Sequence, residues 1–256
     1  MSPVYDCTTE SGRAEGVAKA VEAVRDGKVV VIPTDTVYGV GADAFSQDAV
    51  AAVLAAKGRG REMPPPVLVP IVRTVDGLAT EVPPWARDLI REFWPGPLTL
   101  IFKAQSSLMW DLGETNGTVA LRMPQDDVAL EVLAEVGPMA VTSANRTGQP
   151  PATTVTDAAA QLGAAVEVYL DAGRRADNVP STIVDCTGNE PSILREGALS
   201  ADRLAAVLDT HFPPEGPEAE PVAEPPTDPD TGTGVQDGAI ELPADSTRPA
   251  GERHEL

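Results

Sequence analysis

Short apolar runs rich in β-branched residues alternate along this chain with segments of helical periodicity, and this alternation restricts the fold more than any other feature. Seven runs have the length and composition of strands, namely 28–32, 63–72, 98–102, 118–124, 138–143, 166–170 and 181–185. Helical patterns lie between and after them at 17–26, 46–57, 75–79, 84–93, 127–136, 156–162 and 201–208. The interleaving predicts an α/β (α+β) domain with a twisted, mixed sheet of about seven strands flanked by helices.

The composition divides the chain into two parts. Residues 1–210 contain all of these elements and are predicted to form one globular domain. From residue 211 the chain is rich in Pro, Glu, Asp, Gly and Thr, with almost nothing apolar to bury, so we expect residues 211–256 to be an acidic, proline-rich disordered tail. The tail holds 11 carboxylates against two arginines and contributes −9 to the formal net charge of −20.

The acidic charge limits the classes of partner. A field of this sign does not attract nucleic acid or an anionic membrane, so a polyanion would have to be held by a local cluster of cations. The two cysteines, Cys7 and Cys186, form no C-x-x-C pair and are expected to be free thiols in a reducing compartment. No signal peptide and no apolar run of membrane-spanning length is visible, so we expect a cytoplasmic protein without membrane contact.

Two stretches that follow predicted secondary structure are candidate ligand sites. The stretch Pro33-Thr-Asp-Thr-Val-Tyr-Gly-Val-Gly-Ala-Asp43 leaves a strand as a polar, glycine-bearing turn, and strand ends are common ligand sites in α/β folds. An ordinary strand-to-helix loop is the alternative. Lys57-Gly-Arg-Gly-Arg61 places three cations on a predicted surface loop, which suits polyphosphate, although cations at a helix C-terminus also complement the helix dipole.

Other polar side chains stand at the ends of predicted strands. Ser143 and Asn145 follow one strand, where they can face a phosphate or its magnesium, or act as a helix cap or an Asx turn. Arg122, Ser181 and Arg195 lie at or near the ends of others, with surface ion pairing as the alternative for the arginines.

No Ser-His-Asp arrangement is present, because the only histidines lie in or beside the tail. Asp35, Asp43 and Asp185 are the available candidates for a general base. No metal-binding cluster is apparent.

Seven segments taken together resemble the threonylcarbamoyl-AMP synthase (YrdC-like) family, in the family's order, from about residue 17 to residue 208. They are Pro33-Thr-Asp-Thr-Val-Tyr-Gly-Val-Gly, Lys57-Gly-Arg, Phe93-Trp-Pro-Gly-Pro-Leu-Thr-Leu, Val119-Ala-Leu-Arg-Met-Pro, Thr142-Ser-Ala-Asn, Ser181-Thr-Ile-Val-Asp and Arg195-Glu-Gly. The resemblance implies a single YrdC-like domain with a concave, positively lined ligand cavity. It also implies an enzyme, an L-threonylcarbamoyladenylate synthase, that makes threonylcarbamoyl-AMP and pyrophosphate from L-threonine, bicarbonate and ATP. The product would serve tRNA threonylcarbamoyladenosine formation together with a separate tRNA-modifying transferase complex.

Carried over residue by residue, the resemblance assigns candidate roles to the motif positions. It implies threonine binding by Thr34, Arg122 and Ser181, with Arg122 pairing the substrate carboxylate. The catalytic pair would be Lys57 and Arg59, and the ATP-binding set would be Lys57, Arg59, Arg61, Thr118, Ser143, Asn145 and Arg195. No protein metal site is implied, and Mg²⁺ is expected to arrive with ATP.

One segment departs from the family pattern. Many relatives carry Lys-Pro-Leu followed shortly by a histidine, whereas this chain has Met63-Pro-Pro-Pro-Val-Leu-Val-Pro, which lacks that cation and that histidine. Two alternatives to the synthase stay open at this point. One is a same-fold paralogue that acts on another nucleotide or carbamoyl compound. The other is a noncatalytic tRNA- or rRNA-binding module, with weak RNA binding, although acidity and a content of only ten aromatic residues disfavour it.

Overall fold

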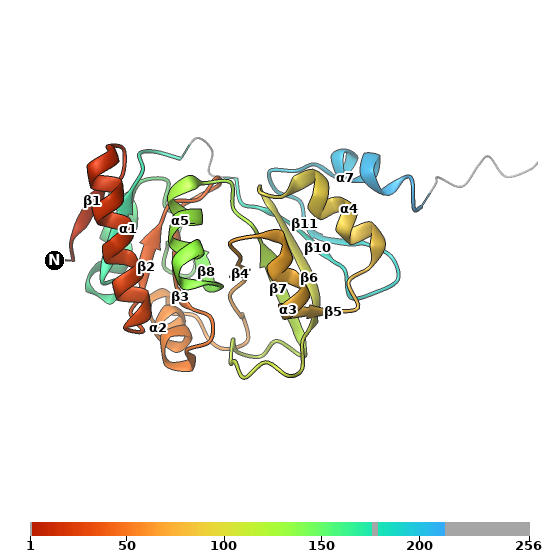
Figure 1. The fold of residues 1–256 in the computed structure, drawn as a ribbon, viewed down its shortest axis with the longest axis horizontal. Helices are drawn as coiled ribbons and strands as arrows, with labels where there is room; N and C mark the ends of the chain where they lie inside the picture. Colours follow the sequence, from red (N-terminus) through yellow and green to blue (C-terminus); the bar gives the residue numbers. More distant parts are fainter. Residues whose placement is uncertain (1, 176–178, 213–256) are drawn as a thin grey trace, which may run out of the picture. The chain divides into compact units, whose positions relative to one another are not determined.

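The structure, a computed structural model, describes residues 2–175 and 179–212. Eleven strands form one twisted mixed sheet in the order β1-β9-β2-β3-β8-β4-β7-β6-β10-β11, with β5 paired to β6 (Figure 1). Four neighbouring pairs are parallel, namely β1 with β9, β9 with β2, β4 with β7 and β6 with β10, and the others are antiparallel. The strands are β1 (Val4–Asp6), β2 (Val30–Ile32), β3 (Gly39–Asp43), β4 (Val67–Leu68), β5 (Ala79–Thr80), β6 (Leu98–Ala104), β7 (Thr118–Arg122), β8 (Met139–Ser143), β9 (Val168–Asp171), β10 (Thr182–Asp185) and β11 (Ser192–Arg195).

The predicted α/β class is confirmed, but the predicted number of about seven strands is wrong. Each of the seven expected runs contains a strand, although 63–72 contributes only β4, because its four prolines offer no backbone N–H to a ladder. The sequence patterns missed β1, β3, β5 and β11. The first, β1, is three residues long and β5 is two, too short for a period-2 signal. Strand β3 carries two glycines in five residues and was read as part of a turn.

Within the described residues, seven α-helices accompany the sheet, and several of their ends follow capping chemistry. They are α1 (Glu10–Arg25), α2 (Gln47–Lys57), α3 (Val75–Leu78), α4 (Pro84–Phe93), α5 (Asp127–Val136), α6 (Val155–Leu162) and α7 (Ala201–Leu208). The Ser46 hydroxyl accepts a hydrogen bond from the Ala49 N–H at the start of α2, and Gly58 ends this helix at φ 64°, a left-handed conformation that suits glycine. No helix in residues 2–175 and 179–212 is long and apolar enough to cross a membrane.

The side chains of the strands alternate between two differently covered faces. On one face, β2, β3 and β9 pack against α2 and α6, and the strands from β4 to β10 pack against α3, α4 and α7. On the other face, α1 and α5 lie side by side over β2, β8 and β9 (Figure 1). The described helices thus leave this second face open over β6, β7 and β10.

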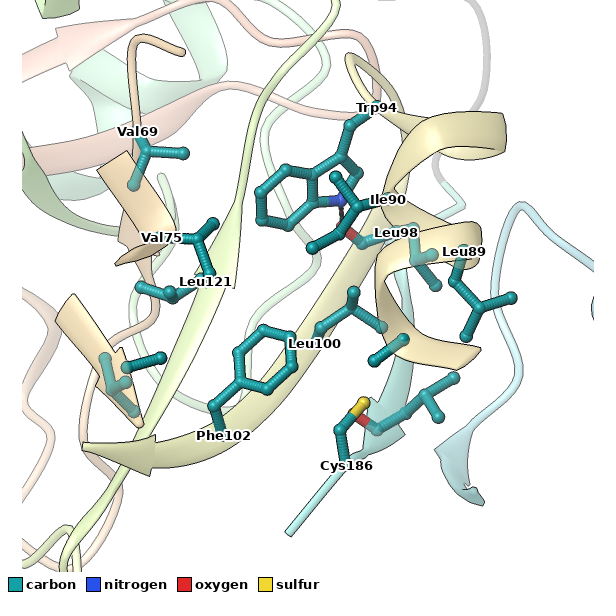
Figure 2. Close-up of a cluster of buried hydrophobic side chains, with 14 of the residues drawn as sticks. Val69, Val75, Leu89, Ile90, Trp94, Leu98, Leu100, Phe102, Leu121 and Cys186 are labelled. Carbon is teal, nitrogen blue, oxygen red and sulfur yellow. Dashed lines mark hydrogen bonds between the residues drawn. The ribbon is translucent and has the colours of Figure 1, made fainter. Parts of the chain in front are cut away.

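Strand β6 contributes alternate side chains to the two faces of the sheet. Leu98, Leu100 and Phe102 of β6 are fully buried and point into the cluster drawn in Figure 2, where the Trp94 indole N–H donates to the Leu98 carbonyl at 2.8 Å. The intervening residues Thr99 and Ile101 therefore point to the opposite, uncovered face of the sheet.

The predicted domain boundary remains a prediction. The described residues, 2–175 and 179–212, belong to one compact unit. Apart from its first two residues, the expected tail lies outside the described part of the chain.

Candidate active site

A cavity of about 430 Å³ lies on the uncovered face of the sheet. Its floor consists of alternate residues from adjacent strands, which is the pattern that a pleated sheet imposes. These residues are Thr99 and Ile101 of β6, Thr118, Ala120 and Arg122 of β7, Val141 and Ser143 of β8, Gly39 of β3, Ile183 of β10 and Arg195 of β11. The loops 34–38, 64–66 and 180–181 add walls, so residues far apart in sequence converge here.

The charge of this cavity is opposite to that of the chain. Arg59, Arg122 and Arg195 line it, whereas within residues 2–175 and 179–212 no aspartate or glutamate does. Eight serine and threonine side chains join them, from Thr34, Thr36, Thr99, Thr115, Thr118, Thr142, Ser143 and Ser181. A concave site with this lining focuses positive potential and offers many donors to an anion.

Arg122 is held rigidly at the end of β7. Its Nε donates to the Gly96 carbonyl at 3.0 Å, Nη1 donates to the Thr36 hydroxyl at 3.2 Å, and Nη2 donates to Asp35 Oδ1 at 2.6 Å. The side chain is 8% exposed and that of Asp35 is 12% exposed. Burial lowers the pKa of Arg122, and the Asp35 carboxylate opposes that shift. Each terminal nitrogen keeps a second N–H that none of these bonds uses, so the guanidinium can still bind an anion at two points.

Ser181 and Arg195 form the wall opposite this strand end. The Arg195 guanidinium donates to the Ser181 carbonyl at 3.1 and 2.8 Å and to the Ser181 hydroxyl at 3.2 Å. The Ser181 hydroxyl also lies 2.9 Å from that of Thr99. Burial lowers the pKa of Arg195, and the nearby Arg122 charge lowers it further. Two cations that raise each other's energy in this way are stabilised when an anion binds between them.

Thr34 forms the turn between β2 and β3. Its hydroxyl donates to the Val37 carbonyl at 2.6 Å and accepts from the N–H groups of Thr36 and Val37 at 3.2 and 3.3 Å. The side chain lines the cavity, but its hydrogen-bonding capacity is mostly used within the turn. Its contribution to the site in this structure is therefore the shape of the wall.

Lys57 corrects the expectation of a surface loop. The residue is 2% exposed, and its ammonium donates to the backbone carbonyls of Ser143 and Asn145 and to the Asn145 side-chain oxygen. It does not line the cavity. Burial and the neighbouring Arg59 lower the pKa of Lys57 to about 8. The cation thus lies behind the cavity wall, where it fixes the loop that carries Ser143.

The remaining predicted ligands fall into two groups. Arg59, Thr118 and Ser143 line the cavity, and the Arg59 guanidinium donates to the Thr142 hydroxyl at 3.2 Å while its Nε is buried without a partner among the described residues. Asn145 lies behind the wall, where its amide donates to the carbonyls of Arg146 and Gln149. Arg61 is an exposed residue that pairs with Asp111 at 2.7 Å, outside the lining.

The three candidate general bases differ in their relation to the cavity. Asp43 and Asp185 each accept a backbone N–H two residues along the chain, and their side chains form no hydrogen bond or ion pair with a lining residue among the described residues. Asp35 binds Arg122, and its second oxygen is buried without a partner among the described residues. Asp35 is thus the one of the three with a direct link to the cavity.

Some lining residues were missed at the sequence level. Thr36 and Tyr38 lie within a motif from which only Thr34 was selected. Thr99 is the single polar residue of the apolar run 98–102 and was not among the predicted site residues. A polar residue at one alternate position of a buried strand is the signal that could have identified it.

Two glycines allow β3 and β8 to approach closely at the cavity. A Cβ at Gly39 would lie 2.6 Å from Val141 Cγ1, and one at Gly41 would lie 2.5 Å from Val141 Cγ2 and 2.7 Å from the Ala140 carbonyl. These distances leave no room for a larger residue. The glycines are therefore needed for space, since neither has a positive φ.

Comparison with known proteins agrees with this fold. The family model described as Sua5_yciO_yrdC, Telomere recombination, matches residues 22–197. A Mycobacterium leprae (strain TN) protein named "Putative threonylcarbamoyl-AMP synthase" is 56% identical over 208 residues, 81% of this chain and 94% of that protein. The crystal structure of P. abyssi Sua5 complexed with L-threonine, 32% identical, has a TM-score of 0.76 over 81% of this chain and 61% of that chain. The E. coli YciO structure, 23% identical, shares the fold with a TM-score of 0.72 over 80% of this chain and 100% of that chain. The chain belongs to the Sua5/YciO/YrdC family.

Proposed function

We propose that this protein is an L-threonylcarbamoyladenylate synthase, which makes threonylcarbamoyl-AMP and pyrophosphate from L-threonine, bicarbonate and ATP. The observation that carries the proposal is a cavity lined by three arginines, with no carboxylate from the described residues, in a chain with a formal charge of −20. Each of the three substrates carries at least one negatively charged group, and all three must meet in one site. The name of the M. leprae relative and the threonine bound to P. abyssi Sua5 support the same reaction.

The chemistry asks the protein for position and charge rather than for a nucleophile. The threonine amine attacks the carbon derived from bicarbonate, and loss of water gives a carbamate. A carbamate oxygen then attacks the α-phosphorus of ATP, and the bond to the leaving pyrophosphate breaks. Holding the reactants together and neutralising the charge that develops on phosphate oxygens can provide most of the acceleration.

We assign the threonine subsite to Arg122, Ser181 and the turn at Thr34. The two unused N–H groups of Arg122 suit a carboxylate, since a guanidinium binds carboxylate at two points. The Ser181 hydroxyl lines the same cavity and is available to a polar group of the substrate. Thr34 shapes the wall between them through its turn.

We assign the ATP phosphates to Arg59 and Arg195, with the hydroxyls of Thr118 and Ser143 beside them. In this scheme Lys57 and Asn145 act from behind the wall, by fixing the backbone at Ser143. Arg61 stays an expected ATP ligand from the motif, although its side chain pairs with Asp111 in this structure.

We propose that Mg²⁺ enters the site bound to ATP. The described residues hold no group of three His, Cys, Asp or Glu that could bind a metal. The hydroxyls of Thr118 and Ser143 are neutral oxygen donors, so the residues fit a cation that arrives with the triphosphate better than a resident one. Bound in that way, the cation would neutralise phosphate charge, while the arginines orient the nucleotide.

The product would pass to a separate tRNA-modifying transferase complex in the cytoplasm. ATP-independent, salt-sensitive binding of tRNA in a gel-shift experiment would instead support the noncatalytic module.

The test is the substrate dependence of pyrophosphate release. We expect the purified full chain, with ATP and Mg²⁺, to release pyrophosphate only when both L-threonine and bicarbonate are present. L-Alanine in place of L-threonine is the matched control for the amino acid, and bicarbonate-depleted buffer is the control for the carbon source. Turnover that ignores threonine would refute the synthase and favour a paralogue with another substrate.

A further inference from the structure

Arg175 connects three parts of the fold just behind the wall of the cavity. Its Nη1 donates to the Thr34 carbonyl at 3.2 Å and to Asp126 Oδ2 at 2.8 Å, and its Nη2 donates to the Ala172 carbonyl. The guanidinium also lies 5.5 Å from the centre of the Tyr38 ring, which lines the cavity. One side chain therefore ties the end of β9 and the start of α5 to the turn that follows β2.

The contact with Asp126 is a protected ion pair. The side chains of Arg175 and Asp126 are only 14% and 11% exposed, so solvent screens their attraction less than that of a surface pair. The two carboxylate oxygens of Asp126 have separate tasks, because Oδ1 caps α5 through the Ala129 N–H at 3.1 Å while Oδ2 binds Arg175. The ion pair is thus anchored to a helix end, and it presents a rigid donor to the turn.

Because Thr34 lies two residues beyond the end of β2, its backbone carbonyl takes its hydrogen bond from outside the turn, from Arg175. The internal hydrogen bonds of the Thr34 hydroxyl shape the turn but do not fix it to the rest of the protein. The next residue, Asp35, is held by Arg122 on the cavity side. Two arginines therefore hold two consecutive residues of the turn from different directions.

We propose that Arg175 is a positioning residue for the threonine subsite, which holds the turn at Thr34 and Asp35 in register with Arg122. The inference rests on the proposed function, since it concerns the same cavity. Arg175 does not touch the proposed ligand positions of Arg122 or Ser181, so it acts through the turn. A displacement of about 1 Å at a substrate contact is enough to cost on the order of 100-fold in rate.

The experiment compares four variants of the full chain with the wild type in the pyrophosphate assay, with threonine and ATP varied separately. Arg175→Gln removes the charge, and Arg175→Lys keeps the charge without the fork. Asp126→Asn removes the ion pair while an asparagine still caps α5. Arg174→Gln is the matched control, because among the described residues this exposed neighbour forms one side-chain hydrogen bond, to the Thr153 hydroxyl.

We expect Arg175→Gln to raise the KM for threonine about tenfold or more, the effect of losing one charge-assisted contact, with less than about threefold change in the KM for ATP. Asp126→Asn should show the same split more weakly, Arg175→Lys should recover part of the loss, and Arg174→Gln should match the wild type. A purely structural role would lower the thermal midpoint without separating the two KM values.

The outcomes distinguish this inference from the proposed function. No threonine-dependent turnover in the wild type would refute the function itself. Normal wild-type turnover together with an unchanged threonine KM in Arg175→Gln would refute the positioning role alone. If Arg175→Gln does not fold, Arg175→Lys and Asp126→Asn decide, and wild-type threonine KM values in both would overturn the inference.

Discussion

The ion pair between Arg122 and Asp35 gives a prediction whose size follows from burial. Removing the carboxylate in Asp35→Ala leaves Arg122, 6% exposed, as an uncompensated buried cation and deprives the Gln125 N–H of its acceptor. Breaking one side of a buried pair costs about 3–5 kcal/mol. The unpartnered second oxygen of Asp35 is lost as well, which places the expected loss near the lower end, about 3 kcal/mol. For a domain of this size that corresponds to a drop of roughly 6–12 °C in the thermal midpoint.

The isosteric variant separates charge from geometry. Asp35→Asn keeps an oxygen for Arg122 Nη2 and for the Gln125 N–H, so only the charge-assisted part of the bond disappears, about 1 kcal/mol. Asp35→Ala should raise the KM for threonine more than that for ATP, because Arg122 loses the partner that orients it. Asp35→Asn should show the same split more weakly, because the oxygen stays and only its charge is lost.

The assay combines urea unfolding with threonine-dependent pyrophosphate release. The control is Glu135→Ala, which removes an exposed pair with Arg25, with side chains 60% and 62% exposed, and should cost no more than about 1 kcal/mol. If Asp35→Ala is as stable as Glu135→Ala and keeps the wild-type KM for threonine, the buried ion pair neither stabilises the fold nor orients Arg122.

Two further predictions concern Lys57 and Gly41. The pKa of Lys57 is lowered from 10.5 to about 8, so between these pH values the unfolded chain still binds a proton that the folded protein has released. The free energy of unfolding contributed by this residue therefore rises with pH across that range, by up to about 3 kcal/mol. Urea unfolding at pH 7.5 and at about pH 10 should show this rise in the wild type but not in Lys57→Met. The same pH dependence of stability in the two proteins would contradict the prediction. Gly41→Ala should lower the thermal midpoint, because its Cβ would meet Val141 Cγ2 at 2.5 Å and overpacking costs about 1–3 kcal/mol. Adding Val141→Ala to that variant should restore only part of the loss, since the Ala140 carbonyl remains at 2.7 Å from the new Cβ. An unchanged midpoint in Gly41→Ala would show that the strands can separate.

Most of the fold could be predicted from the sequence, because its longer helices and strands have strong local signals. The bounds of α4, α5 and α7 agree with the predicted ranges, since apolar periodicity runs through each helix, Pro84 marks the start of α4, and Asp126 and Gly137 flank α5. Strand β3 was missed because close packing against Val141 requires glycine where a strand would otherwise carry β-branched residues. Its position depends on a partner strand that lies about 100 residues further along the chain.

The candidate site was predictable as a set of motifs but not as a geometry. Sequence reasoning placed Lys57 on a surface loop because lysine is rarely buried. Its burial depends on carbonyl groups of Ser143 and Asn145, which become available only through folding. Arg175 lies 141 residues from the Thr34 carbonyl that it binds, and no local pattern marks it as different from other arginines.

Along β6 and β7, alternate side chains separate packing of the core from lining of the cavity. Leu98, Leu100 and Leu121 face the core, while Thr99 and Ala120 face the cavity. A substitution at a cavity position changes ligand contacts without opening a void among the helices, and a substitution in the core leaves the chemical lining intact. The scaffold therefore allows substrate preference to diverge among descendants while the selective constraint on folding acts on a separate set of residues.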